Sequence, residues 1–356
     1  MWDIKRGCKL KKLYVKNYKV LKDFEIDFCD ENENPLPIIV LAGVNGSGKT
    51  SILESIVGMK KVNGLKLETI INNKKRNFDS NGSGIVIYEK GVTEFWYNDE
   101  IKNKILYFSY QIDLRHIKNF LPEYIQKLVF EYDIKASKIY QKIRENIDDI
   151  FKDLNLNIEF DSRDGKGNLY FRHKITKEKF LIDDLSSGEK TLISEILFLY
   201  LNDIKDKIIL IDEPELSLHP TWQNKIFKLY ENYAKKNNCQ IIIATHSPLI
   251  LGSAENKYIR ILTFKNNRVV VKKQNRSYGL EFDRVLLEIM GLDTLRVKEV
   301  EENFDKLRDY IQEKNWQKFL DLYNEMKIYL GENDVDLKLL YMQANLKGLN
   351  ANNNQK

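Results

Sequence analysis

The sequence predicts an α/β protein with a mostly parallel central sheet and extra antiparallel strands toward its N-terminus. Three short runs support the parallel sheet: PIIVLAG at 37–43, KIILI at 207–211 and IIIAT at 241–245. Each run is continuously apolar, as a strand buried on both faces of a parallel sheet must be. Helices are expected to accompany these strands at 48–59 and 191–201.

The antiparallel strands are predicted from shorter apolar pieces bounded by turn residues. Residues 10–28 predict a hairpin with a polar turn near Asn17, and further hairpins are expected at 156–182 and 260–273. Residues 62–110 hold several more strand-like pieces. Within them, Asn72–Gly84 is rich in Asn, Ser and Gly, which predicts a mobile loop.

Helical segments interrupt and follow this domain. Between 116 and 155, apolar residues recur every three or four positions, which predicts a short amphipathic helical insertion. From 278 to 349 we expect a helical extension, with helices at about 297–314, 316–330 and 334–348. Its aromatic residues Trp316, Phe319 and Tyr323 either cap the core or face a partner. The main domain therefore comprises 1–115 and 156–277, and 350–356 forms a disordered tail.

Composition excludes several classes of protein. The 356 residues carry a net charge of only +5, so charge alone predicts no nucleic-acid binding. Cys8, Cys29 and Cys239 form no CxxC pair, which indicates a reducing compartment without disulfides or structural zinc. No signal peptide is recognisable, and no apolar run approaches the roughly 20 residues that span a bilayer. A cytoplasmic protein without membrane contact is therefore expected.

The segment GVNGSGKT at 43–50 matches the phosphate-binding pattern GxxxxGK[ST], between a predicted strand and a predicted helix. Its glycines let backbone N–H groups turn toward a phosphate, and the helix N-terminus adds partial positive charge. Lys49 is expected to face the β- and γ-phosphates of ATP, and Thr50 to bind Mg²⁺. The predicted ATP-binding residues are Gly43, Asn45, Gly46, Ser47, Gly48, Lys49, Thr50 and Ser51.

Two carboxylates follow the strand IILI in the segment DEPELSLHP at 212–220. Asp212 is expected to hold Mg²⁺, and Glu213 to act as the base or to orient water for attack on the γ-phosphate. His246 follows the strand IIIAT, at the sheet edge where ligands of α/β proteins collect, and is predicted to contact the γ-phosphate as a neutral imidazole. For His219 a structural role and a contact with an opposite subunit are equally open.

The segment LSSGEK at 185–190 opens the apolar helix at 191–201. Ser186 and the Gly188 N–H can donate to phosphate oxygens at a helix N-terminus, and Glu189 belongs to the same predicted ATP contact. These groups are not expected to reach the ATP of their own subunit, so we predict that they act on a second copy. The alternative is a plain capping box formed by Ser186 and Glu189, and both roles are compatible.

Two further features are assigned more weakly by the sequence. Gln111, after the predicted strand KILYFSY, is a candidate for contact with Mg²⁺ and the attacking water, and Arg115 for a nucleotide-linked switch. The basic side chains near the last hairpin form either a phosphate track or a solvated face. They are Lys265, Arg268, Lys272, Lys273 and Arg276.

Taken together, GVNGSGKT with SILESI, LSSGEK, DEPELSLHP and ATHSPLIL resemble the ABC-type ATPases of the SMC, RecF and OLD kind. The resemblance covers about residues 10–265 and implies an ABC ATPase head of the P-loop class at 1–115 and 156–277. It implies ATP and Mg²⁺ as cofactors and a head-to-tail homodimer, or larger assembly, closed around ATP. A transporter head is disfavoured, because transporters tend to have Thr after DEP and a charged residue after TH.

Within this branch, the tail beginning SYGLEFDRVLLEIMG is similar to small stand-alone antiphage ATPases of the Septu type. That likeness implies control of a separate nuclease, of the HNH type, or of a toxin. The region after Tyr278 is too short and too helical for the Toprim nuclease domain of OLD proteins, so no intrinsic nuclease is expected. The alternative is a RecF-like repair ATPase that binds DNA itself as an ATP-gated clamp.

Overall fold

The computed structural model describes residues 9–57, 69–71, 74–76, 84–88, 91–92, 105–108, 158–164, 168–201, 204–216, 218–273 and 278–349, with single positions 130, 138, 141 and 145. The chain divides into two compact units, Met1–Gly291 and Leu292–Lys356. Each unit has its own hydrophobic core.

The first unit is built on a six-stranded sheet with the order β15-β14-β3-β13-β12-β8. Every neighbouring pair is parallel except β14 and β15, which confirms the predicted mostly parallel central sheet. The strands are β3 (Ile38–Gly43), β8 (Ile105–Phe108), β12 (Ile208–Asp212), β13 (Gln240–Ala244), β14 (Ile259–Lys265) and β15 (Arg268–Lys273).

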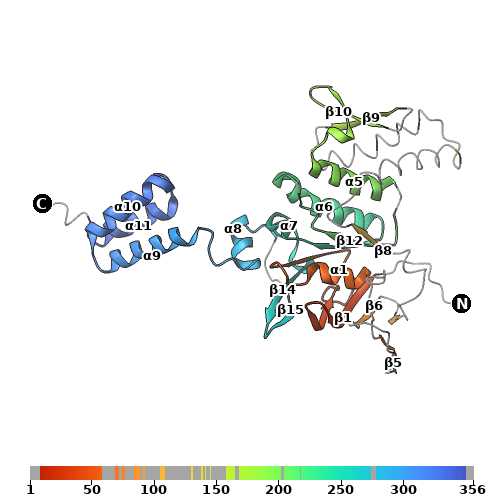
Figure 1. Ribbon diagram of the computed structural model, residues 1–356, viewed down its shortest axis with the longest axis horizontal. Coiled ribbons are helices and arrows are strands. Elements are labelled where there is room, and N and C mark those ends of the chain that lie inside the picture. Colours follow the sequence, from red (N-terminus) through yellow and green to blue (C-terminus); the bar gives the residue numbers. More distant parts are fainter. Residues whose placement is uncertain are drawn as a thin grey trace. The chain divides into compact units, whose positions relative to one another are not determined.

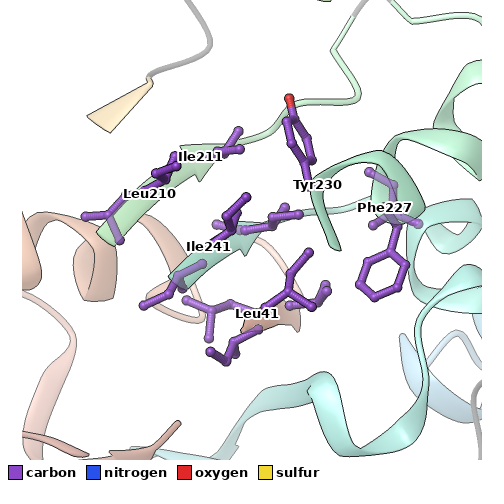
Figure 2. Close-up of a cluster of buried hydrophobic side chains, with 14 of the residues drawn as sticks. Leu41, Leu210, Ile211, Phe227, Tyr230 and Ile241 are labelled. Atoms are coloured by element: carbon purple, nitrogen blue, oxygen red, sulfur yellow. The ribbon is translucent and has the colours of Figure 1, made fainter. Parts of the chain in front are cut away.

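Helices cover this sheet on both sides, with α1 (Lys49–Val57) on one and α6 (Pro220–Lys236) on the other (Figure 1). The continuously apolar strands are fully buried between them, as their sequences predict. Figure 2 shows Leu41, Leu210 and Ile241 of the sheet in one cluster with Phe227 and Tyr230 of α6. Truncating one such side chain typically costs about 2–5 kcal/mol, so the strand ends that carry the motifs are held in place by a well-packed core.

The N-terminal antiparallel sheet has the order β2-β1-β6-β7. Its strands are β1 (Leu10–Tyr18), β2 (Leu21–Asp27), β6 (Gly84–Tyr88) and β7 (Gly91–Val92). The predicted first hairpin is confirmed, and its turn at Lys19 and Val20 lies just beyond Asn17. Asn17 pairs with Lys22 across the two strands and accepts a hydrogen bond from its ammonium group, while Lys19 takes the left-handed φ of 49°.

The two other predicted hairpins are also confirmed. The strands β9 (Ile158–Arg163) and β10 (Leu169–His173) pair, and β11 (Lys179–Leu181) adds a third strand. Between β14 and β15, Asn266 and Asn267 both have left-handed φ values, 50° and 59°, as a two-residue hairpin loop requires.

The shorter elements connect these layers. The described part of the first unit also contains β4 (Thr69–Ile71), β5 (Lys74–Arg76), α5 (Ser187–Leu201), α7 (Pro248–Ser253) and α8 (Phe282–Arg284). It further contains the short 3₁₀ helices η1 (Ile182–Asp184) and η2 (Asn256–Tyr258) and the π-helix η3 (Val285–Ile289). Strand β5 pairs with β4, so Lys74–Arg76 is a strand within the predicted loop Asn72–Gly84. The predicted helical insertion 116–155 and the tail 350–356 lie outside the described residues, apart from isolated helical positions.

The second unit contains α9 (Lys298–Gln312), α10 (Trp316–Leu330) and α11 (Val335–Leu346), which confirms the three predicted C-terminal helices. Asn315 and Asp334 cap α10 and α11 by accepting backbone N–H groups. Trp316 and Phe319 are buried in the core of this unit, so they stabilise it and are not displayed to a partner.

Several absences are observed within the described part of the chain. None of its helices combines the length and the apolar character that crossing a bilayer requires. Cys29 and Cys239 are both buried and unbonded to another cysteine. Among the same residues, no three His, Cys, Asp or Glu side chains gather closely enough to hold a metal ion by themselves.

A buried polar pair joins α5 to α6. Glu195 of α5 is only 3% exposed and accepts a hydrogen bond from the Tyr230 hydroxyl at 2.5 Å. Burial raises the pKa of Glu195 to about 7, although the bond from Tyr230 lowers it. Because the folded pKa exceeds the ordinary value, the folded state binds the additional proton. The free energy of unfolding should therefore fall as pH rises from about 4.5 to about 7.

We expect Glu195→Gln to increase the free energy of unfolding at pH 8 by about 3 kcal/mol, and to change it little at pH 4.5. The amide cannot ionise, and its carbonyl oxygen can still accept from Tyr230. Urea unfolding at both pH values measures the difference. Glu178→Gln, at an exposed position just before β11, is the matched control, and an equal gain at both pH values would contradict the prediction.

Candidate nucleotide-binding site

The phosphate-binding pattern forms the turn between β3 and α1. Gly43 and Gly48 adopt φ values of 148° and 96°, which side chains rarely tolerate. A Cβ atom on Gly43 would also lie 2.5 Å from the Leu262 carbonyl oxygen of β14. Both glycines are therefore required where the chain leaves the buried strand and begins the helix. This is the strand–turn–helix context that the motif predicts.

Lys49 lies in the first turn of α1 and points back into this loop. Its ammonium donates to the carbonyl oxygens of Gly43, at 2.7 Å, and Val44, at 3.3 Å, and only 5% of the residue is exposed. Burial lowers the pKa of Lys49 to about 8, while the nearby carboxylates Glu213, Asp212 and Glu215 raise it. Bound phosphates would raise it further, because an opposite charge favours the protonated form.

Ser47, in the same loop, carries a second feature that fits a ligand. Its hydroxyl oxygen is buried and has no hydrogen-bond partner among the described residues. A buried hydroxyl without a partner costs free energy, so such groups usually mark a missing ligand or water. Asn45 and Gly46 are exposed beside it, while Ser51 is buried one position after Thr50.

Asp212 ends strand β12 beside the first turn of α1. The Thr50 hydroxyl lies 3.3 Å from its Oδ1, and the Tyr107 hydroxyl of β8 donates to its Oδ2 at 3.2 Å. Burial raises the pKa of Asp212, although both hydroxyl contacts lower it. A hydroxyl and a carboxylate oxygen at this spacing are hard donors of the kind that Mg²⁺ binds together with phosphate oxygens. The pair Thr50 and Asp212 therefore fits the predicted metal.

Glu213 and His246 come together at the ends of adjacent strands. Glu213 has a left-handed φ of 52°, and its N–H donates to the Ala244 carbonyl of β13 at 2.8 Å. Its Oε1 lies 3.6 Å from His246 Nε2, and His246 Nδ1 lies 3.5 Å from Lys49 Nζ. Burial and the Lys49 charge both lower the pKa of His246. The lowered pKa favours the neutral form of the imidazole.

Two residues of this cluster were missed by the sequence analysis. Tyr107 was only part of a strand, and nothing in the sequence placed its hydroxyl on Asp212. Glu215 is the second glutamate of DEPE and received no role. Its Oε1 accepts the His246 backbone N–H at 2.5 Å. Its position close to Asp212 and Glu213 in the sequence is the one feature that could have indicated a role at the site.

The other predicted site residues lie apart from this cluster or outside the described residues. Ser186 and Gly188 lie at the start of α5, where Lys190 N–H donates to the Ser186 carbonyl. Figure 1 shows α5 on the far side of α6 from α1. Gln111, Arg115, Arg276 and the side chain of Glu189 are outside the described residues. His219 is exposed and caps α6 by accepting the Thr221 N–H, which supports its structural role.

Comparison with known proteins gives two family models that match adjoining segments. Residues 9–108 match an AAA ATPase domain, and residues 94–252 match an AAA domain described as putative AbiEii toxin, Type IV TA system. Among solved structures, the chain is similar to the Smc head bound to the C-winged helix domain of ScpA. The TM-score is 0.51 at 16% identity, over 74% of this chain and 97% of that one.

Curated relatives give a longer match. The chain is 26% identical to Septu protein PtuA of Bacillus thuringiensis, over 86% of this chain and 91% of the relative. It is 23% identical to Septu protein PtuA of Bacillus mycoides, over 83% of this chain but only 46% of that relative. Together, these matches support an ATPase with the P-loop fold, similar to SMC/OLD-like ABC ATPases. In the P-loop class a turn of this kind binds nucleotide, so the turn between β3 and α1 is the candidate nucleotide-binding loop.

Proposed function

We propose that this ABC ATPase binds Mg²⁺-ATP, dimerises around it, and uses hydrolysis to control a separate effector in antiphage defence. The observation that carries the catalytic part is the chain of contacts from Lys49 through His246 to Glu213, beside the pair Thr50 and Asp212. Five polar side chains from three elements meet there at one edge of the sheet. Ligands of α/β proteins bind at this edge.

Each residue takes one role in hydrolysis. Lys49 neutralises the β- and γ-phosphate charges, and Thr50 and Asp212 hold Mg²⁺, which when bound offsets the charge that develops on the phosphates. Glu213 accepts a hydrogen bond from the attacking water and orients it. His246, as a neutral imidazole, donates a hydrogen bond to the γ-phosphate. Because His246 also contacts Glu213 and Lys49, it links the presence of γ-phosphate to the position of the base.

The dimer is proposed from the separation of the motifs. Ser186 directly precedes α5, and the Gly188 N–H lies in its first turn. This helix is tied to α6 through Glu195 and Tyr230 and is not part of the layer that carries α1. A second copy arranged head to tail can bring these donors to the γ-phosphate of the first. The helix N-terminus of α5 then adds partial positive charge opposite the phosphate loop.

Mixing two inactive variants tests this arrangement. We expect Ser186→Arg to bind ATP but not hydrolyse it, because a bulky cation keeps the interface open. Glu213→Gln is expected to lose turnover for a different reason, the missing base. In a mixed dimer one site takes both changes, and the other pairs an intact Glu213 with an intact Ser186. Hydrolysis measured by phosphate release should therefore reappear on mixing.

The matched control for Ser186→Arg is Thr176→Arg, in the exposed turn between β10 and β11, which should leave hydrolysis near the wild-type rate. Wild-type turnover by Ser186→Arg alone would contradict the trans-acting role. If both single variants are inactive and the mixture stays inactive, two explanations are possible. Either both ATP sites of a dimer must hydrolyse together, or the segment 185–190 acts within its own subunit. Light scattering with ATP distinguishes the two explanations, since only coupled hydrolysis at both sites requires a dimer.

The proposal of a separate effector rests on the similarity to Septu proteins. This chain aligns with most of a Septu protein PtuA, at 26% identity. We propose a separate nuclease of the HNH type, or a toxin, as the partner, and no nuclease activity in this chain. Co-purification with proteins encoded beside it should recover a nuclease or toxin in defined stoichiometry. Metal-dependent DNA cleavage by the isolated chain, retained in Lys49→Ala, would contradict this part of the proposal.

A RecF-like clamp that binds DNA is the second candidate. The observation that favours it is the exposed basic face of the β14–β15 hairpin, formed by Lys265, Arg268 and Lys272. Arg268 also lies 3.4 Å from Asp23 of β2, which offsets part of its charge. DNA binding by the isolated chain that weakens steeply with salt would favour the clamp. Salt-independent or absent binding would favour the effector.

A further inference from the structure

We propose that Glu215 is a positioning residue that fixes His246, and through it Glu213, in the geometry for hydrolysis. This inference rests on the proposed function of the site. Glu215 lies three residues beyond the end of β12, in the turn that begins with Glu213. Its carboxylate reaches across to the end of the neighbouring strand β13, which leads into His246.

His246 lies beyond the last paired residue of β13, so its N–H donates to the Glu215 side chain and not to a neighbouring strand. Ladder pairing of β13 ends at Ala244, and the next amide, Thr245 N–H, donates to Leu41 of β3 at 3.0 Å. The following amide, His246 N–H, donates to Glu215 Oε1 at 2.5 Å. Glu215 therefore fixes the backbone at the point where His246 leaves the sheet.

The turn that carries Glu215 also carries Glu213. Leu216 N–H donates to the Glu213 carbonyl at 3.1 Å, and Leu218 N–H to the Glu215 carbonyl at 2.9 Å. The same short segment therefore positions one side chain of the Glu213–His246 pair directly and the other through the Glu215 carboxylate. The 3.6 Å separation of Glu213 Oε1 and His246 Nε2 therefore depends on the turn itself and on the hydrogen bond between Glu215 and His246 N–H.

The carboxylate is held at a cost in free energy. Glu215 is 9% exposed, and its Oε2 is buried with no hydrogen-bond partner in the described part of the chain. A buried polar atom without a partner typically costs about 1–3 kcal/mol. Burial raises the pKa of Glu215, and the neighbouring Glu213 charge raises it as well. A group held at such a cost beside the predicted base is better explained by positioning than by stability alone.

A matched pair of substitutions isolates the acceptor atom. Glu215→Gln keeps the length of the side chain and a carbonyl oxygen that can accept from His246 N–H. Glu215→Met keeps a similar length but has no such acceptor. We expect kcat for ATP hydrolysis to fall about 10- to 100-fold in Glu215→Met and to stay within about threefold of wild type in Glu215→Gln. The Kd for ATP should change little in both, since binding depends on the β3–α1 loop.

A second readout separates positioning from general destabilisation. The chain has four histidines, so the imidazole NMR resonances of His246 can be assigned by comparison with a His246→Gln variant. These resonances should shift in Glu215→Met and stay near wild type in Glu215→Gln. Glu255→Met, at an exposed position, is the control. If Glu215→Met does not fold, Glu215→Ala takes its place in the same comparison.

Equal kcat and unshifted His246 resonances in Glu215→Met would overturn this inference. A loss of kcat in Glu215→Gln as large as in Glu215→Met would overturn it as well. The loss would then come from the missing negative charge and not from the missing acceptor for His246 N–H. Failure of the proposed function gives a different result, namely unchanged hydrolysis in Glu213→Gln. Turnover lost in Glu213→Gln but retained in Glu215→Met would overturn only the role of Glu215.

Discussion

Lys49→Ala is expected to abolish measurable ATP binding. The ammonium lies in the proposed phosphate-binding loop, held there by the Gly43 and Val44 carbonyl oxygens. The substitution removes a charge-assisted contact to several phosphate oxygens. It leaves the nearby carboxylates Asp212, Glu213 and Glu215 uncompensated, so a polyanion would then enter a site of net negative charge. Equilibrium dialysis with labelled ATP measures the loss directly.

The control for this variant is Lys236→Ala, which removes an exposed lysine from the last turn of α6. Its ATP affinity should equal that of the wild type. Thermal unfolding without nucleotide tests whether Lys49→Ala remains folded, since the Lys49 ammonium also donates hydrogen bonds to the Gly43 and Val44 carbonyl oxygens. A folded Lys49→Ala protein with near-native ATP affinity would remove the assignment of the phosphate-binding loop.

Glu213→Gln is expected to retain ATP binding and to slow turnover by roughly 10²-fold or more. The amide is isosteric with the carboxylate but cannot accept a proton from water. It also preserves the Glu213 N–H contact to Ala244, so the turn after β12 should keep its unusual φ. Since binding and closure precede hydrolysis, the variant should accumulate as an ATP-bound dimer. Phosphate release measures the rate, and light scattering measures the dimer.

Glu255→Gln, an exposed carboxylate near η2, is the matched control and should hydrolyse ATP at the wild-type rate. Unchanged hydrolysis in Glu213→Gln would show that the base lies elsewhere. Slow hydrolysis without an ATP-dependent dimer would retain the role of Glu213 but contradict the dimer that closes around ATP. The two measurements therefore test the catalytic and the assembly proposals separately.

Local sequence determined the elements whose side chains repeat with a clear period or are uniformly apolar. The strands that contain Ile39, Leu210 and Ile242 are apolar throughout because the sheet buries both of their faces. The three C-terminal helices follow from their amphipathic spacing and their caps. The turn between β1 and β2 lies just beyond Asn17, because cross-strand pairing with Lys22 keeps Asn17 itself in the strand.

The same contrast holds at the site. The sequence by itself predicted the strand–turn–helix that carries Gly43, Lys49 and Thr50, because their spacing follows from backbone geometry over eight residues. It also placed Asp212, Glu213 and His246 at strand ends. Only the tertiary structure decided that Tyr107 contacts Asp212 and that Glu215 holds the His246 backbone. Those contacts join strands distant in sequence, so the parallel order of β8, β12 and β13 creates them and no local pattern encodes them.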